Sequence, residues 1–329
     1  MAAHAGVTTM TVSRFLRAPD LVARETAEKI HAALLHTGYT PNKSAGMLAG
    51  GRSSIVAVIV PSIANATFSE TVQALSDGLQ THELELLLAS TNYQSDREEQ
   101  QIRAVLAWSP SALVVTGRMH SSAAKRLLAQ ARASAIPVVQ IWDFDAQDKD
   151  TVQIGFSHKR VGALMAEHLT GRGYHDLVYV DNSVPGDVRA HERSKAFVRA
   201  VRQSQAQVRV VPMPRADPMA AGRAVLQQLQ RDGLPRAMAF SSDFPAAGAW
   251  LHAREAGIAV PQQLALLGFG DYPIAAQLGA GLSTVSVDRQ SLGTLCAQQV
   301  LAMVYPQASE PVAQEQREIR PRIVERGST

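Results

Sequence analysis

Residues 5–16 read Ala-Gly-Val-Thr-Thr-Met-Thr-Val-Ser-Arg-Phe-Leu, and this stretch decides how the first part of the chain folds. Gly6 follows an alanine-rich start and suits a tight turn between two helices, because glycine adopts positive φ angles at little cost. Thr8 or Thr9 can then cap a second helix. The apolar residues of that helix stand three and four positions apart and predict one buried face. They are Val12, Phe15 and Leu16.

The other side of this helix has the composition of a helix that reads DNA. Small polar residues stand at its start and arginines follow, as contact with base edges and phosphates in the major groove requires. The predicted DNA-contacting residues are Thr8, Thr9, Met10, Ser13, Arg14 and Arg17. A further amphipathic helix is predicted over residues 24–37, ending at Gly38. Residues 1–50 are therefore predicted to form a small all-α helix-turn-helix headpiece.

The formal charge is distributed unevenly along the chain. Residues 1–53 contain six basic and three acidic side chains, whereas the remainder contains 26 of each sign, so the net charge of +3 lies in the first part. A polyanionic partner such as DNA would be met there. An excess of this size also arises by chance, so the prediction of a DNA partner depends on the motif.

A different pattern begins at Ile55, where apolar strand-like runs alternate with segments of helical periodicity. The predicted strands are 55–60, 84–89, 112–116, 137–141, 177–180, 208–212, 237–240 and 264–268. The predicted helices are 68–81, 96–108, 122–133, 158–171, 191–203, 218–231, 245–257 and 291–303. Such alternation predicts βαβ units with parallel sheets that are covered on both faces. Because so many units exceed one open sheet of usual size, we predict a two-lobed α/β core over residues 54–329.

The composition argues against several classes of protein. The single cysteine, Cys296, excludes an internal disulfide and a cysteine metal cluster, which fits a reducing cytoplasm. No apolar run reaches the roughly 18 residues of a membrane helix, and the N-terminus lacks the pattern of a signal peptide. We therefore expect a cytoplasmic protein without a membrane partner. No phosphate-binding loop, dinucleotide fingerprint, nucleophile elbow or zinc-protease motif occurs, so we expect no enzyme activity, no cofactor and no metal site.

Residues 5–16 resemble the signature of the lactose/galactose-repressor (LacI-type) family of transcriptional regulators, with Thr8 in the place of a serine. The family's Gly-Tyr-x-Pro-Asn follows as Gly38-Tyr39-Thr40-Pro41-Asn42. The resemblance implies a hinge helix at about residues 42–49, with DNA contacts from Asn42 and Leu48. Leu48 would be a wedge between base pairs in the minor groove. Gly46 departs from the family at a hinge position and raises the cost of forming that helix.

The start of the chain also departs from the family. The family's first helix begins several residues upstream and runs through an Asp-Val-Ala segment, whereas this chain begins Met1-Ala2-Ala3. We therefore expect a truncated first helix, which reflects either a start codon assigned too late or a damaged headpiece.

The resemblance continues through the core and implies a two-lobed fold like that of periplasmic binding proteins. Lobe one is expected over about residues 54–153 plus 286–329, and lobe two over about 154–285. The family implies a homodimer formed through the core, with the predicted helix 68–81 at the subunit contact. The apolar residues of that helix are equally consistent with ordinary packing.

Two segments carry the first candidates for effector binding. Ser62, Asn65 and Phe68 resemble the family's first strand-to-helix turn, at the edge where open α/β sheets bind ligands. The alternative is that Ser62 and Asn65 only cap the helix. Arg193 resembles the arginine that holds the ligand in the family, and a guanidinium can clamp a carboxylate or two sugar oxygens. A solvated Arg193, or Arg189 in its place, is the alternative.

Further candidates suggest the class of effector. Asp243 stands where the family has an aspartate that faces the sugar, and Asp271 lies in a turn that matches the family after the next strand. Thr116-Gly-Arg-Met-His120 and the motif Pro-Ser-x-x-Asn are similar to gluconate-utilisation repressors. This similarity suggests a sugar acid, with Arg118, His120 and Arg193 as its partners. The family's Asp-Asn pair before the first helix of lobe two is Ser157-His158 here, which weakens any identification of the effector.

These features together predict a DNA-binding repressor whose affinity for its operator is controlled by a small sugar or sugar-acid effector. The alternative is a solute-binding protein of the same core fold without a DNA function. Such a protein would need a signal peptide and would not need residues 6–48.

Overall fold

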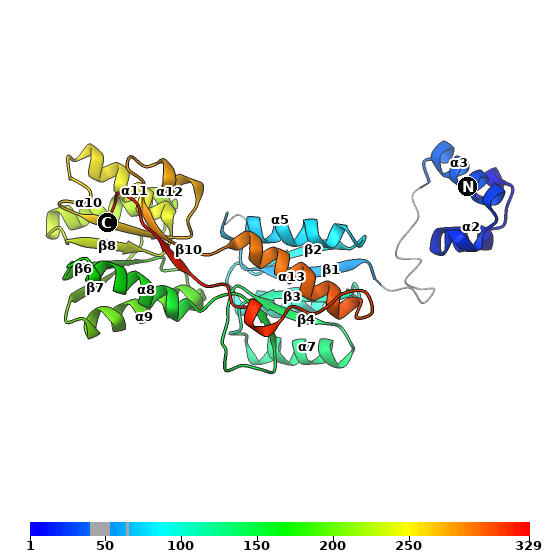
Figure 1. Cartoon of the computed structure of the whole chain (residues 1–329), viewed down its shortest axis with the longest axis horizontal. Helices are drawn as coiled ribbons and strands as arrows, with labels where there is room; N and C mark the ends of the chain where they lie inside the picture. Colours follow the sequence, from blue (N-terminus) through cyan, green and yellow to red (C-terminus); the bar gives the residue numbers. More distant parts are fainter. Residues whose placement is uncertain (40–52, 64–65) are drawn as a thin grey trace. The chain divides into compact units, whose positions relative to one another are not determined.

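The computed structural model describes residues 1–39, 53–63 and 66–329, which form two compact units, Met1–Ser53 and Ser54–Thr329 (Figure 1). The first unit contains α1 (Ala2–Ala5), α2 (Thr9–Arg17), the short 3-10 helix η1 (Pro19–Leu21) and α3 (Arg24–Thr37). The Thr8 hydroxyl accepts a hydrogen bond from the Thr11 amide at 3.1 Å, as expected for the cap of α2. Gly6 adopts a φ of +63°, as the expected turn requires.

The headpiece core is small. Its buried residues are Ala5, Val12, Ile30 and Ala33, and Phe15 is packed against them while half-exposed. Leu16, which the helical spacing predicted to be buried, is 38 % exposed. The prediction for Leu16 was wrong because the buried face of so short a helix is narrow, and Val12 and Phe15 already fill it.

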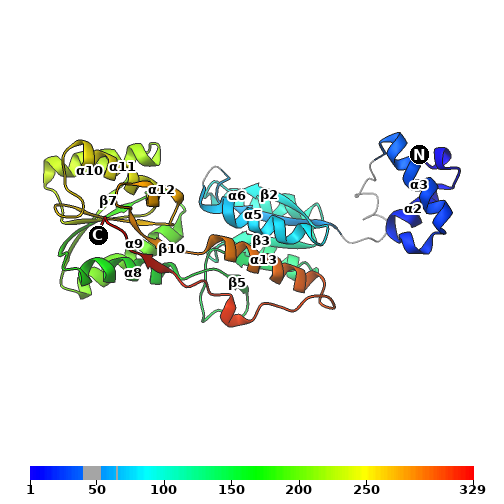
Figure 2. The same cartoon turned by 45° about the horizontal axis from the view of Figure 1, so that its top comes forward.

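The second unit contains two sheets, each with helices on both faces. The five-stranded sheet of the first lobe has the order β2-β1-β3-β4-β5 and is parallel throughout. Its strands are β1 (Ile55–Val60), β2 (Glu85–Ser90), β3 (Ala112–Thr116), β4 (Val138–Ile141) and β5 (Val152–Ile154). Its helices are α5 (Ala66–Gln80), α6 (Ser95–Leu106) and α7 (Ser122–Ala133), with α13 (Arg289–Val304) packed beside α5 (Figure 2).

The six-stranded sheet of the second lobe has the order β11-β10-β9-β8-β6-β7. Its strands are β6 (Asp176–Asp181), β7 (Gln207–Pro212), β8 (Ala237–Phe240), β9 (Ala265–Phe269), β10 (Ser283–Ser286) and β11 (Arg322–Val324). Helices α8 (His158–Gly171) and α9 (Val188–Gln203) share one hydrophobic core, while α10 (Pro218–Asp232) and α11 (Asp243–Glu255) share another. The short α12 (Pro273–Gln277) follows β9, and the 3-10 helix η2 (Gln314–Gln316) precedes β11.

Burial on both faces explains why the strands are apolar without alternation. In β1, Val56 and Val58 pack in the core that contains α5 and α13, whereas Ala57 and Ile59 pack in the core that contains α6 and α7. Successive side chains of a strand point to opposite faces, so a sheet covered on both sides needs apolar residues at every position.

The course of the last residues corrects the expected lobe boundaries. Residues 286–329 were assigned as a whole to lobe one, but β11 pairs antiparallel with β10 in the sheet of the second lobe. The final residue is also held there, because the Thr329 hydroxyl lies 2.8 Å from His168 Nε2 on α8. The chain therefore returns to the second lobe after α13, and so short a strand carries no periodicity that would reveal this.

Candidate functional site

A cavity of about 480 Å³ lies between the two lobes of the second unit. Its walls include residues that follow the carboxyl ends of strands in both sheets, namely Ser62 after β1, Trp142 after β4, Asn182 after β6 and Ser241 after β8. This edge of open parallel sheets is where α/β proteins bind ligands. The volume falls within the range of small-molecule sites, about 300–1000 Å³.

Aromatic side chains form much of the cavity wall. Phe68 and Trp142 from the first lobe have ring centroids 5.1 Å apart, and Phe244 and Tyr272 from the second lobe have centroids 5.0 Å apart. The Tyr272 hydroxyl donates a hydrogen bond to Thr67 Oγ1 at 2.7 Å, which joins the two lobes. The ligand would therefore meet an apolar wall with a few fixed polar groups.

Arg193 of α9 is the central polar group of this wall. Its side chain is buried, its guanidinium carbon lies 4.4 Å from the centroid of the Phe269 ring, and Nη1 lies 2.9 Å from His158 Nδ1. Among the described residues, the buried Trp142 Nε1 and Ser241 Oγ have no hydrogen-bond partner, and both residues lie in the cavity wall. Buried polar groups without a partner are costly, so these atoms indicate a ligand that supplies the missing bonds.

His158 holds Arg193 in this position. Burial, together with the nearby guanidinium groups of Arg193 and Arg189, lowers the pKa of His158 well below its ordinary value. The ring is therefore neutral, and its Nε2–H donates to the Trp142 carbonyl at 2.8 Å. The other ring nitrogen then accepts the hydrogen bond from Arg193. His158 thus connects the first lobe, through Trp142, with the guanidinium of the second.

Arg189 brings a second guanidinium to the cavity. It is 9 % exposed, and its Nη1 lies 3.5 Å from the carbonyl oxygen of Thr116 at the end of β3. Gly117 permits this approach, because its φ is +85° and a Cβ atom there would lie 2.7 Å from Arg189 Nη1. Any other residue at position 117 would be strained and would displace Arg189.

The cavity wall contains the side chains of two arginines and two aspartates. The aspartates are Asp187 and Asp217, and both carboxylates cap helices: Asp187 accepts from the Ala190 amide, and Asp217 from the Met219 and Ala220 amides. Asp187 also accepts from the Asn182 amide group at 2.9 Å. Because both carboxylates already accept hydrogen bonds, the two arginines are the charged groups of the wall best able to bind a ligand, and guanidinium groups bind anions.

The structure brings only some of the predicted effector residues together. Ser62, Phe68 and Arg193 line the cavity. Asn65 lies outside the described residues. Arg118, His120, Asp243 and Asp271 do not line it, and each is engaged elsewhere.

Asp243 is the clearest correction. Its side chain is fully buried at the start of α11, where Oδ1 accepts from the Thr284 hydroxyl at 2.6 Å and Oδ2 from the Tyr272 amide at 2.8 Å. Burial raises the pKa of Asp243 to about 6. The carboxylate therefore fastens α11 to β10 and to the turn after β9. Asp271 likewise binds within its own lobe, 2.7 Å from Arg326.

Arg118 and His120 are also held by carboxylates rather than facing the cavity. The Arg118 guanidinium lies 3.2 Å from Asp143, 3.4 Å from Asp145 and 3.2 Å from Glu192. Because Glu192 belongs to α9, this cluster joins the lobes beside the cavity. His120 Nδ1 lies 2.7 Å from Glu98, within the first lobe.

Several residues of the site were missed or passed over in the sequence. Arg189 was only an alternative to Arg193, and His158 stood out only as a departure from the family. Trp142 and Phe244 gave no signal, because single aromatic residues at strand ends are equally common in cores. Tyr272 lay within a motif that was noted for Asp271.

The headpiece presents the predicted DNA-contacting residues on its surface. Thr8, Thr9, Met10, Ser13 and Arg14 are exposed on α2, and Met10 is 71 % exposed. The side chain of Arg17 and all of Asn42 and Leu48 lie outside the described part of the structure. Exposed small polar side chains together with an arginine on one helix suit contact with base edges and phosphates.

The described residues contain neither a cluster that could hold a metal ion nor a helix that could span a membrane. No three His, Cys, Asp or Glu side chains in residues 1–39, 53–63 and 66–329 lie together in a way that would hold a metal ion. Nor does this part of the chain contain a helix that is long and apolar enough to cross a membrane.

Comparisons with known proteins cover both units. Residues 1–42 match the family described as bacterial regulatory proteins, lacI family, and residues 166–329 match the periplasmic binding protein-like domain. The HTH-type transcriptional regulator GntR of Pseudomonas aeruginosa is 36 % identical over 311 residues, which are 92 % of this chain and 88 % of that protein. The HTH-type transcriptional regulator IdnR of Escherichia coli is 29 % identical over 92 % of this chain and 90 % of that protein.

A solved structure agrees with the whole fold. The crystal structure of a LacI family transcriptional regulator from Silicibacter pomeroyi superposes with a TM-score of 0.89 and 31 % identity, covering 99 % of this chain and 97 % of that one. The similarity thus includes the headpiece as well as the two-lobed core.

Proposed function

The chain belongs to the lacI family of bacterial regulatory proteins and is a DNA-binding transcriptional regulator, and we propose that its effector is a sugar acid bound in the cavity between the lobes. One observation carries this proposal: two buried arginines, Arg189 and Arg193, border the cavity, while the carboxylates of its wall are committed to helix caps. A ligand carboxylate would accept charge-assisted hydrogen bonds from these guanidinium groups, which are stronger than the hydrogen bonds that the hydroxyl groups of a neutral sugar accept.

The cavity offers complementary contacts for the rest of such a ligand. The fork of the Arg193 guanidinium suits both oxygens of a carboxylate. Ser241 Oγ and Ser62 would bond to hydroxyl groups, and the rings of Phe244 and Trp142 would cover the carbon chain. The proposed effector residues are therefore Ser62, Phe68 and Arg193, together with Arg189 and His158. They no longer include the side chains that bind elsewhere, those of Arg118, His120, Asp243 and Asp271.

The effector would act on DNA through the arrangement of the lobes. A ligand that touches both lobes stabilises one relative arrangement, and this arrangement sets the spacing of two headpieces in a homodimer. A two-fold dimer reading two half-sites is the usual partner of a palindromic operator. We propose that the protein acts in this way as a repressor in the cytoplasm, without catalysis.

The alternative, a solute-binding protein of the same core, is less well supported. Such a protein shares the cavity and the two lobes but has no use for a helix-turn-helix unit. The match of residues 1–42 to the regulatory family argues for the regulator.

Thermal unfolding of the full chain with gluconate or glucose tests the effector class. Gluconate should raise the unfolding temperature of the wild type more than glucose does, and Arg193→Ala should abolish the gluconate effect. Removing one partner of a buried charged contact costs on the order of 2–5 kcal/mol of binding free energy. Arg160→Ala is the matched control, since Arg160 is an exposed arginine on α8 that pairs with Glu167. If glucose stabilises the wild type strongly, or if gluconate stabilises Arg193→Ala as much as the wild type, the effector is not a sugar acid. Neither result would contradict the function as a transcriptional regulator.

The hinge assignment is tested separately on DNA. Leu48→Ala should weaken binding to a DNA fragment that the full chain selects from a random pool, because the family resemblance makes Leu48 a wedge in the minor groove. The variant should keep the wild-type unfolding temperature of the core. An unchanged DNA affinity in a gel-shift titration would count against the hinge.

A further inference from the structure

The outward face of α9 carries a row of basic residues, of which three are lysine or arginine. His191, Lys195, Arg199 and Arg202 are exposed along it, and the spacing of four and then three residues places them on one side of the helix. Like charges at such spacings destabilise a helix. Residues 54–329 as a whole contain equal numbers of basic and acidic side chains, so this row is a local excess.

The structure supplies little compensation for the row. In the described part of the chain, Lys195, Arg199 and Arg202 take part in no ion pair, because Glu192, the acidic residue of α9, is engaged with Arg118 and Lys159. The helix dipole favours a cation in the last turn of α9, where Arg202 lies. It does not explain Lys195 and Arg199, which lie before that turn. Ion pairs within the described part of the unit therefore do not explain the row.

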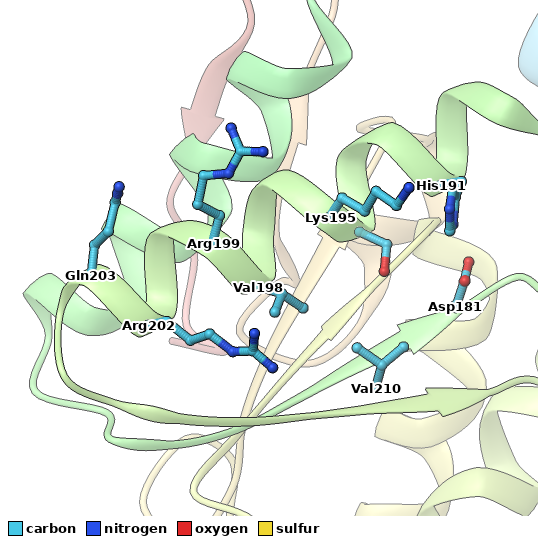
Figure 3. A pocket seen from close by; sticks show the side chains of 9 residues that line it. Asp181, His191, Lys195, Val198, Arg199, Arg202, Gln203 and Val210 are labelled. Carbon is cyan, nitrogen blue, oxygen red and sulfur yellow. The ribbon is translucent and has the colours of Figure 1, made fainter.

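A groove of about 670 Å³ runs beside this row, between α9 and β7 (Figure 3). Val198 points from the helix into the groove, and Val210 of β7 lies across from it, with Arg202 reaching between them (Figure 3). Val210 is 46 % exposed. One carboxylate, that of Asp181, lies at the end of the groove near His191. The groove thus combines a cationic rim with an apolar floor.

The floor ends at an open strand edge. β7 is the last strand of its sheet and pairs only with β6 among the described strands. The Gln207 amide donates to the His175 carbonyl just before β6, and the Met213 amide donates to the Asp181 carbonyl of β6. In a parallel ladder, alternate residues bond to the same neighbour. The amides and carbonyls of Val208 and Val210 therefore point to the open edge, which ends at Pro212 because proline has no N–H.

We propose that this groove binds an extended acidic peptide segment of a partner protein, which adds as a strand to the open edge of β7. The main chain of the peptide would pair with Val208 and Val210, and its acidic side chains would meet Lys195 and Arg202. A second copy of this chain is disfavoured at the same edge, since it would bring two cationic rows together. A nucleic acid would use the cations but neither the apolar floor nor the strand edge.

A fluorescein-labelled peptide, Glu-Val-Glu-Val-Glu-Val-Glu, tests this proposal by anisotropy with the full chain. Alternation places all glutamates on one side of an added strand. We expect the peptide to bind, and the double variant Lys195→Glu/Arg202→Glu to weaken binding by at least about tenfold. The control Lys125→Glu/Arg126→Glu, which makes the same charge change at two exposed positions of α7, should stay within about twofold of the wild type.

Two further arms test the strand edge. Val210→Pro removes the outward N–H without touching the bonds to β6 and should weaken binding to a similar extent, with folding checked by circular dichroism. A peptide methylated on alternate backbone nitrogens should fail to bind the wild type, and this arm does not depend on any variant folding.

Several outcomes would contradict the proposal. If the peptide does not bind, the row serves only to keep the protein soluble and to prevent the open edge of β7 from pairing with other strands. If the α7 control variant weakens peptide binding equally, or if the methylated peptide binds as well as the unmethylated one, the row attracts the peptide only through unspecific charge. Binding of a single-stranded oligonucleotide through Lys195 and Arg202 without peptide binding would assign the groove to nucleic acid. Loss of a dimer in Val210→Pro without peptide binding would assign the edge to a second copy.

Discussion

Two buried polar clusters of the second lobe, one around Arg193 and one around Asp243, lie near neighbouring strand ends and differ in what they leave unsatisfied. Both Asp243 oxygens accept hydrogen bonds from within the lobe. Arg193 lines a cavity, and His158 accepts a hydrogen bond from Nη1–H, one of the five N–H groups of the guanidinium. The difference teaches that a buried charge marks a ligand site only where some of its hydrogen-bonding capacity remains open. Asp243 is on this criterion a structural residue.

Replacing Asp243 gives the largest expected effect. Asp243→Ala would leave the Tyr272 amide and the Thr284 hydroxyl without their acceptor, and we expect the free energy of unfolding to fall by about 3 kcal/mol. Urea unfolding measures this. Protein that remains folded should bind gluconate with nearly wild-type affinity. A stable Asp243→Ala variant that has lost gluconate binding would reverse the roles given to the two clusters.

The two clusters should also respond to acid in opposite directions. Burial raises the pKa of Asp243 to about 6 in the folded state, so the folded state binds the proton more tightly than the unfolded state, whose pKa is about 3.9. The stabilisation from this group is full below about pH 4 and is lost as the pH rises through about 6. The pKa of His158 is lowered instead, so its contribution is lost as the pH falls below about 6.5.

Single variants separate these two contributions. Relative to the wild type, Asp243→Asn should lose the gain in stability between pH 6 and pH 4 that we attribute to Asp243, a difference on the order of 2 kcal/mol. His158→Gln should lose the acid-induced destabilisation, which makes the variant less sensitive to acid than the wild type. Urea unfolding at several pH values measures both. Parallel pH profiles of the wild type and both variants would show that neither group has the environment described.

A smaller effect is expected at Gly117. Gly117→Ala places a methyl group against the Arg189 guanidinium at a positive φ, and we expect gluconate affinity to fall by about tenfold. Gly171→Ala is the matched control, because nothing lies within 4 Å of an added Cβ there. Calorimetric titration compares the two. Equal affinity of both variants for gluconate would separate Arg189 from the site.

The sequence indicated local features better than it indicated long-range partners. The cap at Thr8, most strands and the position of Arg193 follow from neighbouring residues and from the family pattern. The partners of Asp243 and Arg118 do not, because Thr284 lies 41 residues from Asp243 and Glu192 lies 74 residues from Arg118. Nothing in either local sequence shows whether a carboxylate or a guanidinium is already paired. The strand β11 was missed for the same reason, since its partner β10 precedes it by a helix and a long loop.

Binding of the full chain to its selected DNA fragment, titrated with gluconate, tests the central claim most directly. Effector and DNA are linked through the arrangement of the lobes, so gluconate should shift the DNA affinity of the wild type, by a coupling typically about 5- to 150-fold. The same titration should leave the DNA affinity of Arg193→Ala unchanged, while glucose should shift neither protein. A wild-type DNA affinity that ignores gluconate, or an Arg193→Ala variant that responds as the wild type does, would contradict the account.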